Sequence, residues 1–247
     1  MTKLTRNTDQ LFAEVAEHVA QDRIIQGTYG EYTENGFRGC FLGCLAHSKN
    51  GGDDFYDSSD TVRRVIERFN FTEPFLRIAE SIFEGLPADE ARQFFADFPA
   101  AVGTDGKDLS LVHWQFFAAD LRALPPVPAD VQVVIDPVIA GMDLLANGQE
   151  WPEAGAAEAA AWAARAAARA AARGAEAAEA AAWAAEAAAW GARAAARGAE
   201  AAEAAAWAAR AAAWGAEAAD AAAWGAARRQ RDLFLELVGV APVEVQP

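Results

Sequence analysis

Two cysteines and a histidine lie close together in the sequence, at a spacing that could bind a metal ion. Cys40, Cys44 and His47 follow one another at steps of four and three residues, which places their side chains on one face of a helix. Thiolate and imidazole groups are ligands of zinc and iron. The segment therefore predicts a zinc or iron centre and, with it, a metal-dependent enzyme. Four further residues could supply a fourth ligand: Asp53, Asp54, His18 and His113.

The same segment also has a purely structural interpretation. Gly36, Gly39 and Gly43 form a row of small residues beside the cysteines, which is typical of a helix packed closely against a neighbour. In that arrangement the thiols act as small apolar side chains in the core, and no cofactor is expected. A disulfide between Cys40 and Cys44 is not expected either, because their separation along a helix would strain it. The sequence leaves the metal and the packing interpretations open.

Other catalytic motifs are absent from the sequence. It contains no phosphate-binding loop, no G-x-S-x-G elbow, no H-E-x-x-H zinc motif and no G-x-G-x-x-G fingerprint. The acidic loop at residues 50–60 lacks the ligand order of an EF-hand, and its aspartates are explained as caps of the following helix. His113 lies in an apolar stretch and is expected to be a core residue. The sequence therefore favours a protein without enzymatic activity.

Charge, apolar runs and cysteine content limit the class of protein further. The formal net charge is −15, which argues against nucleic-acid binding by neutralisation of phosphates. The sequence has no stretch of 18 strongly apolar residues and no secretory signal, so neither a membrane span nor export is expected. Two cysteines do not make a disulfide scaffold and are typical of a reducing cytoplasm. These features predict an acidic cytoplasmic protein.

Residues 1–148 have the pattern of a compact helical domain. Pro74 suits the first turn of a helix, and Pro137 is expected to kink one. Residues 131–135 are rich in β-branched side chains, but a lone strand would need a partner that is not evident. The expected fold class is all-α, a multi-helix domain followed by a long helical tail. Apolar residues recur at helical spacing near residues 8–26, 37–48, 59–69, 73–86, 87–98, 109–124 and 131–145.

The first of these stretches is expected to bury one helical face. This face is formed by the apolar residues Leu11, Phe12, Val15 and Val19. Asn7, Thr8 or Asp9 can cap the start of the helix.

Residues 149–241 form a different kind of sequence, rich in alanine and tryptophan. Residues 173–192 and 197–216 repeat one another and differ only at Glu186 and Arg210. Alanine has the highest helix propensity, so we expect a coiled-coil-like helical repeat, built as one long helix or as several stacked helices. Residues 242–247 are expected to be disordered.

The larger side chains of this tail follow a single stripe. From Glu158 to Trp224, tryptophan, glutamate and arginine succeed one another at steps of three or four residues, among alanine and glycine. A mean step of about 3.5 residues keeps such side chains on one edge of a supercoiled helix. Burial of this edge would bury charged groups. We therefore expect the alanine face to be buried and the mixed edge to be exposed.

Five tryptophans of this edge are the candidate interaction site. Together they carry on the order of 1,000 Å² of surface, which is more than a soluble monomer normally exposes. Blocks of arginine alternate with blocks of glutamate along the edge, so a staggered or antiparallel second copy would match them. We expect a homo-oligomer formed through the tail, with a host or other cellular protein as the alternative partner. The five residues are Trp183, Trp190, Trp207, Trp214 and Trp224.

The segments FRGCFLGCLAHS and FLRIAESIFEGLP, the phenylalanine-rich stretch that follows and the alanine-rich tail resemble a group of uncharacterised bacterial and bacteriophage proteins. The tails of that group combine alanine with tyrosine and aspartate, whereas this tail uses tryptophan, glutamate and arginine. The resemblance implies a bacterial or bacteriophage origin and no particular site residue.

The function that the sequence favours is that of a non-enzymatic interaction protein. Its tail would mediate self-association or partner binding, and a bacteriophage origin would make a host component its target. The metal-dependent enzyme is the first alternative. Ice binding by a flat alanine face is the second, although the regular threonines of alanine-rich antifreeze helices are missing.

Overall fold

The computed structural model describes residues 4–34, 36–47, 58–123, 129–152 and 220–244. The chain divides into two units: Met1–His113 with Trp224–Pro247 form unit 1, and Trp114–Ala223 form unit 2. The described residues are mostly helical, as the sequence predicts, and none of their helices is long and apolar enough to cross a membrane. The unit boundaries differ from those expected at residues 148 and 241, because the C-terminal helix belongs with the N-terminal residues.

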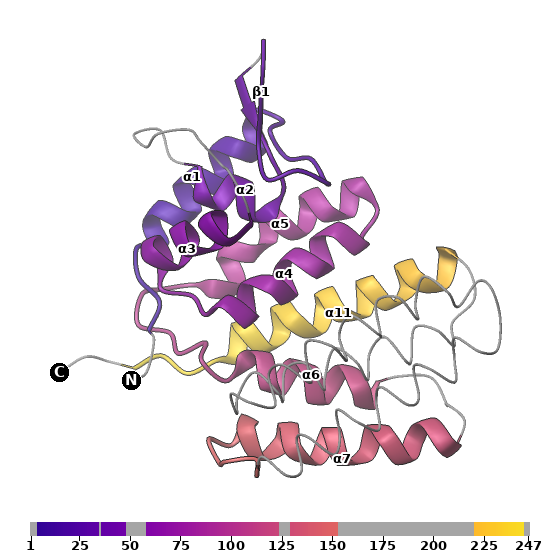
Figure 1. The fold of residues 1–247 in the computed structure, drawn as a ribbon. Helices are drawn as coiled ribbons and strands as arrows, with labels where there is room; N and C mark the ends of the chain where they lie inside the picture. The colour runs from indigo at the N-terminus through magenta and orange to yellow at the C-terminus, as the bar shows by residue number, and fades with distance from the viewer. Residues whose placement is uncertain (1–3, 35, 48–57, 124–128, 153–219, 245–247) are drawn as a thin grey trace. The chain divides into compact units, whose positions relative to one another are not determined.

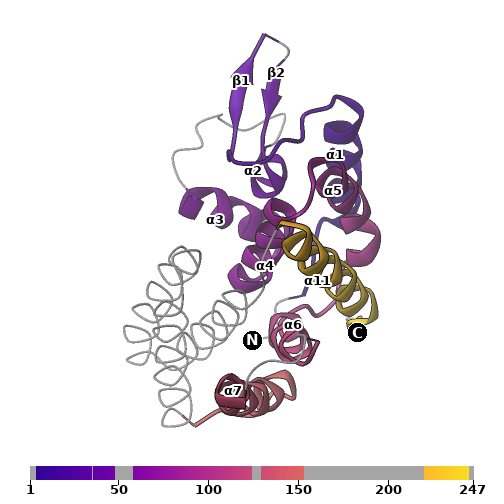
Figure 2. The same cartoon turned by 90° about the vertical axis from the view of Figure 1, so that its right-hand side faces the viewer.

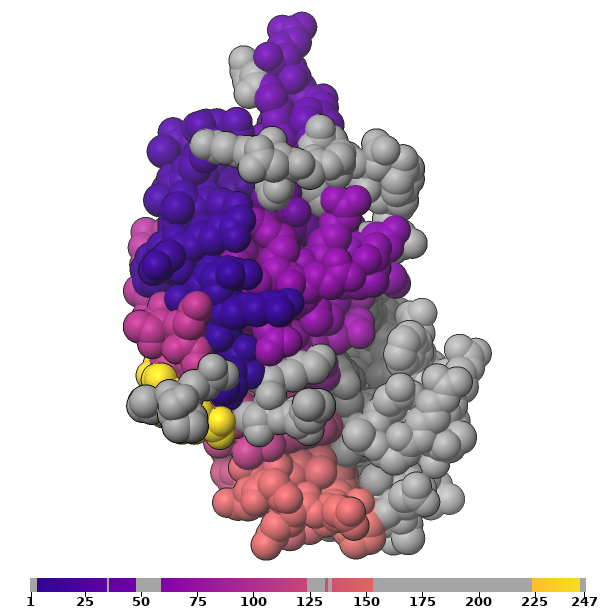
Figure 3. Space-filling view, turned by 90° about the vertical axis from the view of Figure 1, so that its left-hand side faces the viewer, coloured from indigo at the N-terminus to yellow at the C-terminus, as the bar shows by residue number. Residues whose placement is uncertain are grey.

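Unit 1 combines helices with one short hairpin. Strands β1 (Glu31–Thr33) and β2 (Gly36–Arg38) are antiparallel, with Tyr32 opposite Phe37. The hairpin stands out from the helices in two views (Figures 2 and 3), and it departs from the all-α expectation. The helices are α1 (Thr8–Ala20), α2 (Phe41–Ala46), α3 (Ser58–Phe69), α4 (Glu73–Gly85), α5 (Ala88–Val102) and α11 (Asp220–Val240). Helix α11 belongs to unit 1 from Trp224 onward.

The core of unit 1 is a cluster of phenylalanine rings. Helix α1 packs against α2 and α5, α2 packs against α3 and α4, and α4 packs against α5 (Figure 1). The ring centroid of Phe41 in α2 lies 5.0 Å from that of Phe98 and 5.6 Å from that of Phe94, both in α5. Full burial of such a side chain is worth about 1.5–3 kcal/mol. The fully buried rings of unit 1 are Phe41, Phe69, Phe71, Phe75, Phe83, Phe94, Phe95, Phe98 and Phe234.

Helix α1 buries a face different from the one that its apolar residues suggest. Leu11 and Val15 are buried, as expected, but Phe12 and Val19 are each 42% exposed. His18 is the fourth buried residue of the face, after Thr8, Leu11 and Val15. Phe12 and Val19 each follow a buried residue directly, so each lies about 100° around the helix from it. The expectation that all four apolar residues share one buried face is therefore wrong.

Unit 2 is described for two helices and the segment that follows them. They are α6 (Val112–Arg122), which belongs to unit 2 from Trp114 onward, and α7 (Ala129–Ala146). Residues 131–135, considered above as a strand, lie within α7. Beyond α7, the indole of Trp151 lies against the backbone of Gly141, where a Cβ atom would come within 2.2 Å of the ring atom Cε2. Glycine is therefore required at position 141 to seat Trp151.

Candidate interaction site

Cys40 and Cys44 are buried at α2 and serve as small core side chains. Cys40 is the N-cap residue of α2 and is 2% exposed, and Cys44 lies inside the helix and is 0% exposed. The thiol of Cys44 donates a hydrogen bond to the carbonyl oxygen of Gly39 at 3.2 Å. Burial raises the pKa of the Cys40 thiol to about 12 and that of Cys44 well above its usual range. Both thiols are therefore protonated at neutral pH.

The glycines beside the cysteines are explained by a close approach of the backbone. A Cβ atom at Gly43 would lie 1.6 Å from the carbonyl oxygen of Tyr29, and one at Gly39 would lie 2.6 Å from it. The amide of Cys40 also donates to the carbonyl oxygen of Thr28 at 2.7 Å. The loop that carries Thr28 and Tyr29 thus rests directly on α2. This contact accounts for the two glycines of the Gly-Cys-x-x-Gly-Cys segment.

His47 takes part in a cluster of rings. Its imidazole stacks on Phe37 of β2, with the ring centroids 3.9 Å apart and the planes 8° apart. The ring of His18 meets His47 edge-on at 5.3 Å and Phe95 at 6.5 Å. Burial, then the nearby charge of His47, lower the pKa of His18 to about 4. These rings connect the hairpin to α1 and α5.

The metal centre considered above is not assembled in the part of the chain that the structure describes. No group of three or more His, Cys, Asp and Glu residues is placed there to hold a metal ion. His113 is buried in α6, and its pKa is lowered to about 4 by burial. Asp53 and Asp54 lie outside the described residues. The zinc or iron site and the metal-dependent enzyme therefore stay predictions, which elemental analysis of the purified protein can test.

The burial of His18 predicts a specific loss of stability in acid. The unfolded chain binds a proton at His18 below about pH 6.5, whereas the folded chain does so only near pH 4. The free energy of unfolding should therefore fall as the pH is lowered from 6.5 to 4, by up to about 1.4 kcal/mol per pH unit from this group. His47, Arg23 and Arg68 add to the effect, and Glu17 opposes it.

Urea unfolding of the wild type and of His18→Gln between pH 7 and pH 4 measures this contribution. The variant should show a shallower fall in the free energy of unfolding, while His113, whose pKa is also lowered, keeps part of the slope in both proteins. Equal slopes in the two proteins would show that His18 is not held neutral by the fold.

Trp224 is the described member of the candidate interaction site. Trp183, Trp190, Trp207 and Trp214 lie outside the described residues. In α11, 47% of Trp224 is exposed, whereas Ala226 and Ala227 are 4% and 6% exposed. A Cβ atom at Gly85 of α4 would lie 3.5 Å from the Cβ of Ala227, so Ala227 of α11 packs closely on α4. At this point of the chain, alanine is buried and tryptophan is exposed.

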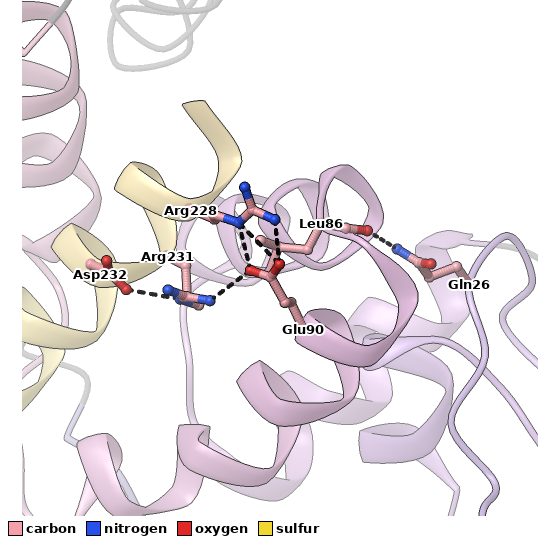
Figure 4. Close-up of polar contacts among 6 residues, drawn as sticks. All are labelled: Gln26, Leu86, Glu90, Arg228, Arg231 and Asp232. Carbon is pink, nitrogen blue, oxygen red and sulfur yellow. Dashed lines mark hydrogen bonds and ion pairs between the residues drawn. The ribbon is translucent and has the colours of Figure 1, made fainter. Parts of the chain in front are cut away.

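Helix α11 is fixed to unit 1 by charged groups at two places. The Glu90 carboxylate of α5 accepts hydrogen bonds from Arg228 at 2.5–3.0 Å and from Arg231 at 3.1 Å, and Arg231 also binds Asp232 (Figure 4). Buried Lys107 donates from Nζ to carbonyl oxygens at the C-terminal ends of α5 and α11, at 2.9–3.1 Å. A cation at this end of a helix is favoured by the helix dipole. Lys107 therefore holds two helix ends together.

The chain after α11 is also paired with unit 1. The amide of Asp108 donates to Pro242 at 2.8 Å, and the amide of Glu244 donates to Gly106 at 2.9 Å. Residues 242–244 are therefore ordered by backbone hydrogen bonds, in contrast to the disorder expected for residues 242–247. The alanine-rich repeat is consequently followed, as well as preceded, by described helices.

No protein-family model, curated protein or solved structure matches the chain. Neither an activity nor a partner is therefore carried over from a relative, and the resemblance to bacterial and bacteriophage proteins stays an expectation.

Proposed function

We propose that the protein is a non-enzymatic interaction protein that associates with further copies of itself through the edge of its alanine- and tryptophan-rich segment. The burial pattern of α11 carries this proposal: Ala226 and Ala227 are buried while Trp224 is half exposed. In the repeat, each tryptophan likewise follows three alanines and has alanine two residues after it, whereas the third residue after it is Glu or Arg instead of the alanine at position 227. Each indole offers about 150–250 Å² of apolar surface, and several in register form a patch that favours association.

The attachment of the segment at both ends supports a role in presenting a surface. Before the repeat, Trp151 is seated on Gly141 of α7. After the repeat, α11 is held by Lys107 and by the buried ring of Phe234. Residues 153–219 connect these two points, so the proposed surface is tied to folded elements on both sides.

The reactive side chains of the described part also support binding over catalysis. The Cys40 and Cys44 thiols are buried and protonated at neutral pH. A nucleophilic or metal-binding cysteine needs a thiolate, which this environment disfavours. These groups stabilise the fold, and the proposed tryptophan edge is left as the functional surface.

Replacement of the four repeat tryptophans by alanine tests the proposal. The variant carrying Trp183→Ala, Trp190→Ala, Trp207→Ala and Trp214→Ala should have a lower mass than the wild type in light scattering. Alanine keeps the helix propensity of the segment, so the change removes the indole surface alone.

The matched control substitutes exposed apolar residues outside the repeat. Phe12→Ala and Val240→Ala remove side chains that are 42% and 74% exposed, and the mass should stay that of the wild type. A wild-type chain that remains at 26.2 kDa across a range of protein concentrations would contradict self-association. An unchanged oligomer in the four-tryptophan variant would contradict the role of the repeat tryptophans in that association.

A further inference from the structure

The sequence around Trp224 is self-complementary in charge. Asp220 lies four residues before Trp224 and Arg228 lies four residues after it. At 100° per residue, these spacings fall within about 40° of Trp224 on a helix. The row is therefore acidic on one side of the tryptophan and basic on the other.

Such a row matches a second copy of itself in the antiparallel orientation. A two-fold axis at position 224 places each residue before the tryptophan opposite the residue equally far after it in the other copy. Trp224 then meets the partner's Trp224, and Asp220 meets the partner's Arg228. A parallel pairing in register would instead place like charges opposite each other, which is unfavourable.

The described side chains leave the centre of this row accessible. Trp224 is 47% exposed, and 45% of the Arg228 side chain is exposed. Arg228 donates to Glu90 from Nε and Nη2, while its Nη1 makes no hydrogen bond to a described residue. Glu90 thus fixes the guanidinium with one edge still able to bind a carboxylate. Gly225 has open space around it, with nothing within 4 Å of a Cβ position, so a second helix can approach closely.

We propose that the N-terminal part of α11 is a contact between two copies of the chain, antiparallel and centred on Trp224. This contact rests on the proposed self-association and gives it a defined partner and geometry. Exposed ion pairs contribute little free energy each, so the two indoles supply most of the affinity. The two pairs between Asp220 and Arg228 fix the orientation.

Exchange of charges between two variants tests this geometry. Asp220→Arg places two arginines opposite each other, and Arg228→Glu places two acids opposite each other. Each variant alone should dimerise about tenfold more weakly than the wild type, since two like-charge pairs together cost about 1.4 kcal/mol. Their equimolar mixture should recover the affinity, because every opposing pair then combines an acid with an arginine. Analytical ultracentrifugation measures the affinities.

Two further variants keep the test decisive. Arg228→Glu also removes a tie to Glu90, so a thermal melt must show that it folds. If it does not, Asp220→Arg and Trp224→Ala carry the test, and both should weaken the dimer. Glu236→Arg reverses an exposed charge elsewhere on α11 and should leave the affinity unchanged.

The outcomes separate this contact from the proposed function. Weaker dimers of Trp224→Ala and Asp220→Arg, together with recovery in the mixture, support the contact. Wild-type affinity in both Trp224→Ala and Asp220→Arg overturns the contact. If the four-tryptophan variant dissociates in that case, self-association through the repeat is still supported. A wild-type chain that is always monomeric overturns both proposals. If Trp224→Ala dissociates while the four-tryptophan variant keeps the oligomer of the wild type, the contact at Trp224 is supported and the role of the repeat is overturned.

Discussion

Replacement of Gly43 by alanine is expected to lower the free energy of unfolding by at least about 3 kcal/mol. The added Cβ would lie 1.6 Å from the carbonyl oxygen of Tyr29, 2.5 Å from its carbonyl carbon and 3.1 Å from its Cα. All three are backbone atoms, so no change of rotamer relieves the overlap. Either α2 or the loop at Tyr29 must move, which would disturb the Phe41 ring at the start of α2. Urea unfolding of the two proteins measures the loss.

Gly225→Ala is the matched control, since Gly225 is also a helical glycine. Nothing lies within 4 Å of its Cβ position, and alanine is favoured over glycine in a helix by about 1 kcal/mol. This variant should therefore be slightly more stable than the wild type. If Gly43→Ala proved equally harmless, the close approach of Tyr29 would be wrong, and the packing interpretation of Cys40 and Cys44 would lose its main support.

The helices of unit 1 could be predicted because each buries one face in a shared core. In α4, for example, Phe75, Ile78, Ile82 and Phe83 recur at helical spacing and all are completely buried. The hairpin was missed because its strands are only three residues long, too short for a clear alternation. The one signal available was the Asn35-Gly36 dipeptide, which is typical of a hairpin turn.

Contacts between distant residues could not be predicted from the sequence. The start of α1 is capped by Asp105, whose Oδ1 accepts hydrogen bonds from the amide of Thr8 at 2.8 Å and from its hydroxyl at 2.7 Å. Local reasoning favoured Asn7, Thr8 or Asp9 as the cap, because it considers only neighbouring residues. Thr8 does take part, but as a donor to a carboxylate 97 residues away.

The candidate sites were ambiguous for a related reason. The spacing of Cys40, Cys44 and His47 suits both a metal site and a packed helix, and the contact of Tyr29 with Gly43, which supports the packing interpretation, cannot be predicted from that spacing. The core role of α11 did have a signal in the sequence, since Phe234 and Val238 are one turn apart. Because the residues before them are rich in alanine, Phe234 and Val238 were expected to belong to the tail instead.

Replacement of Phe234 by alanine is expected to lower the free energy of unfolding by about 3–5 kcal/mol. The ring is completely buried, with its centroid 5.0 Å from that of Phe75 and 6.2 Å from that of Phe94. Its removal would leave a cavity between α11 and the helices α4 and α5. If residues 149–241 formed a separate tail, the same substitution would have almost no effect on the rest of the chain.

Urea unfolding followed by circular dichroism measures the effect of Phe234→Ala, with Val240→Ala as the control. Val240 lies on the same helix but is 74% exposed, so its substitution should change the free energy of unfolding by less than about 0.5 kcal/mol. Equal stability of the two variants would show that α11 is not part of the core. If Phe234 has the expected effect, a chain that ends after Gln149 loses this ring together with the carbonyl partners of Lys107 at Val238 and Gly239. Such a truncation would unfold unit 1 as well as remove the repeat, which is why self-association has to be tested by substitutions in the full chain.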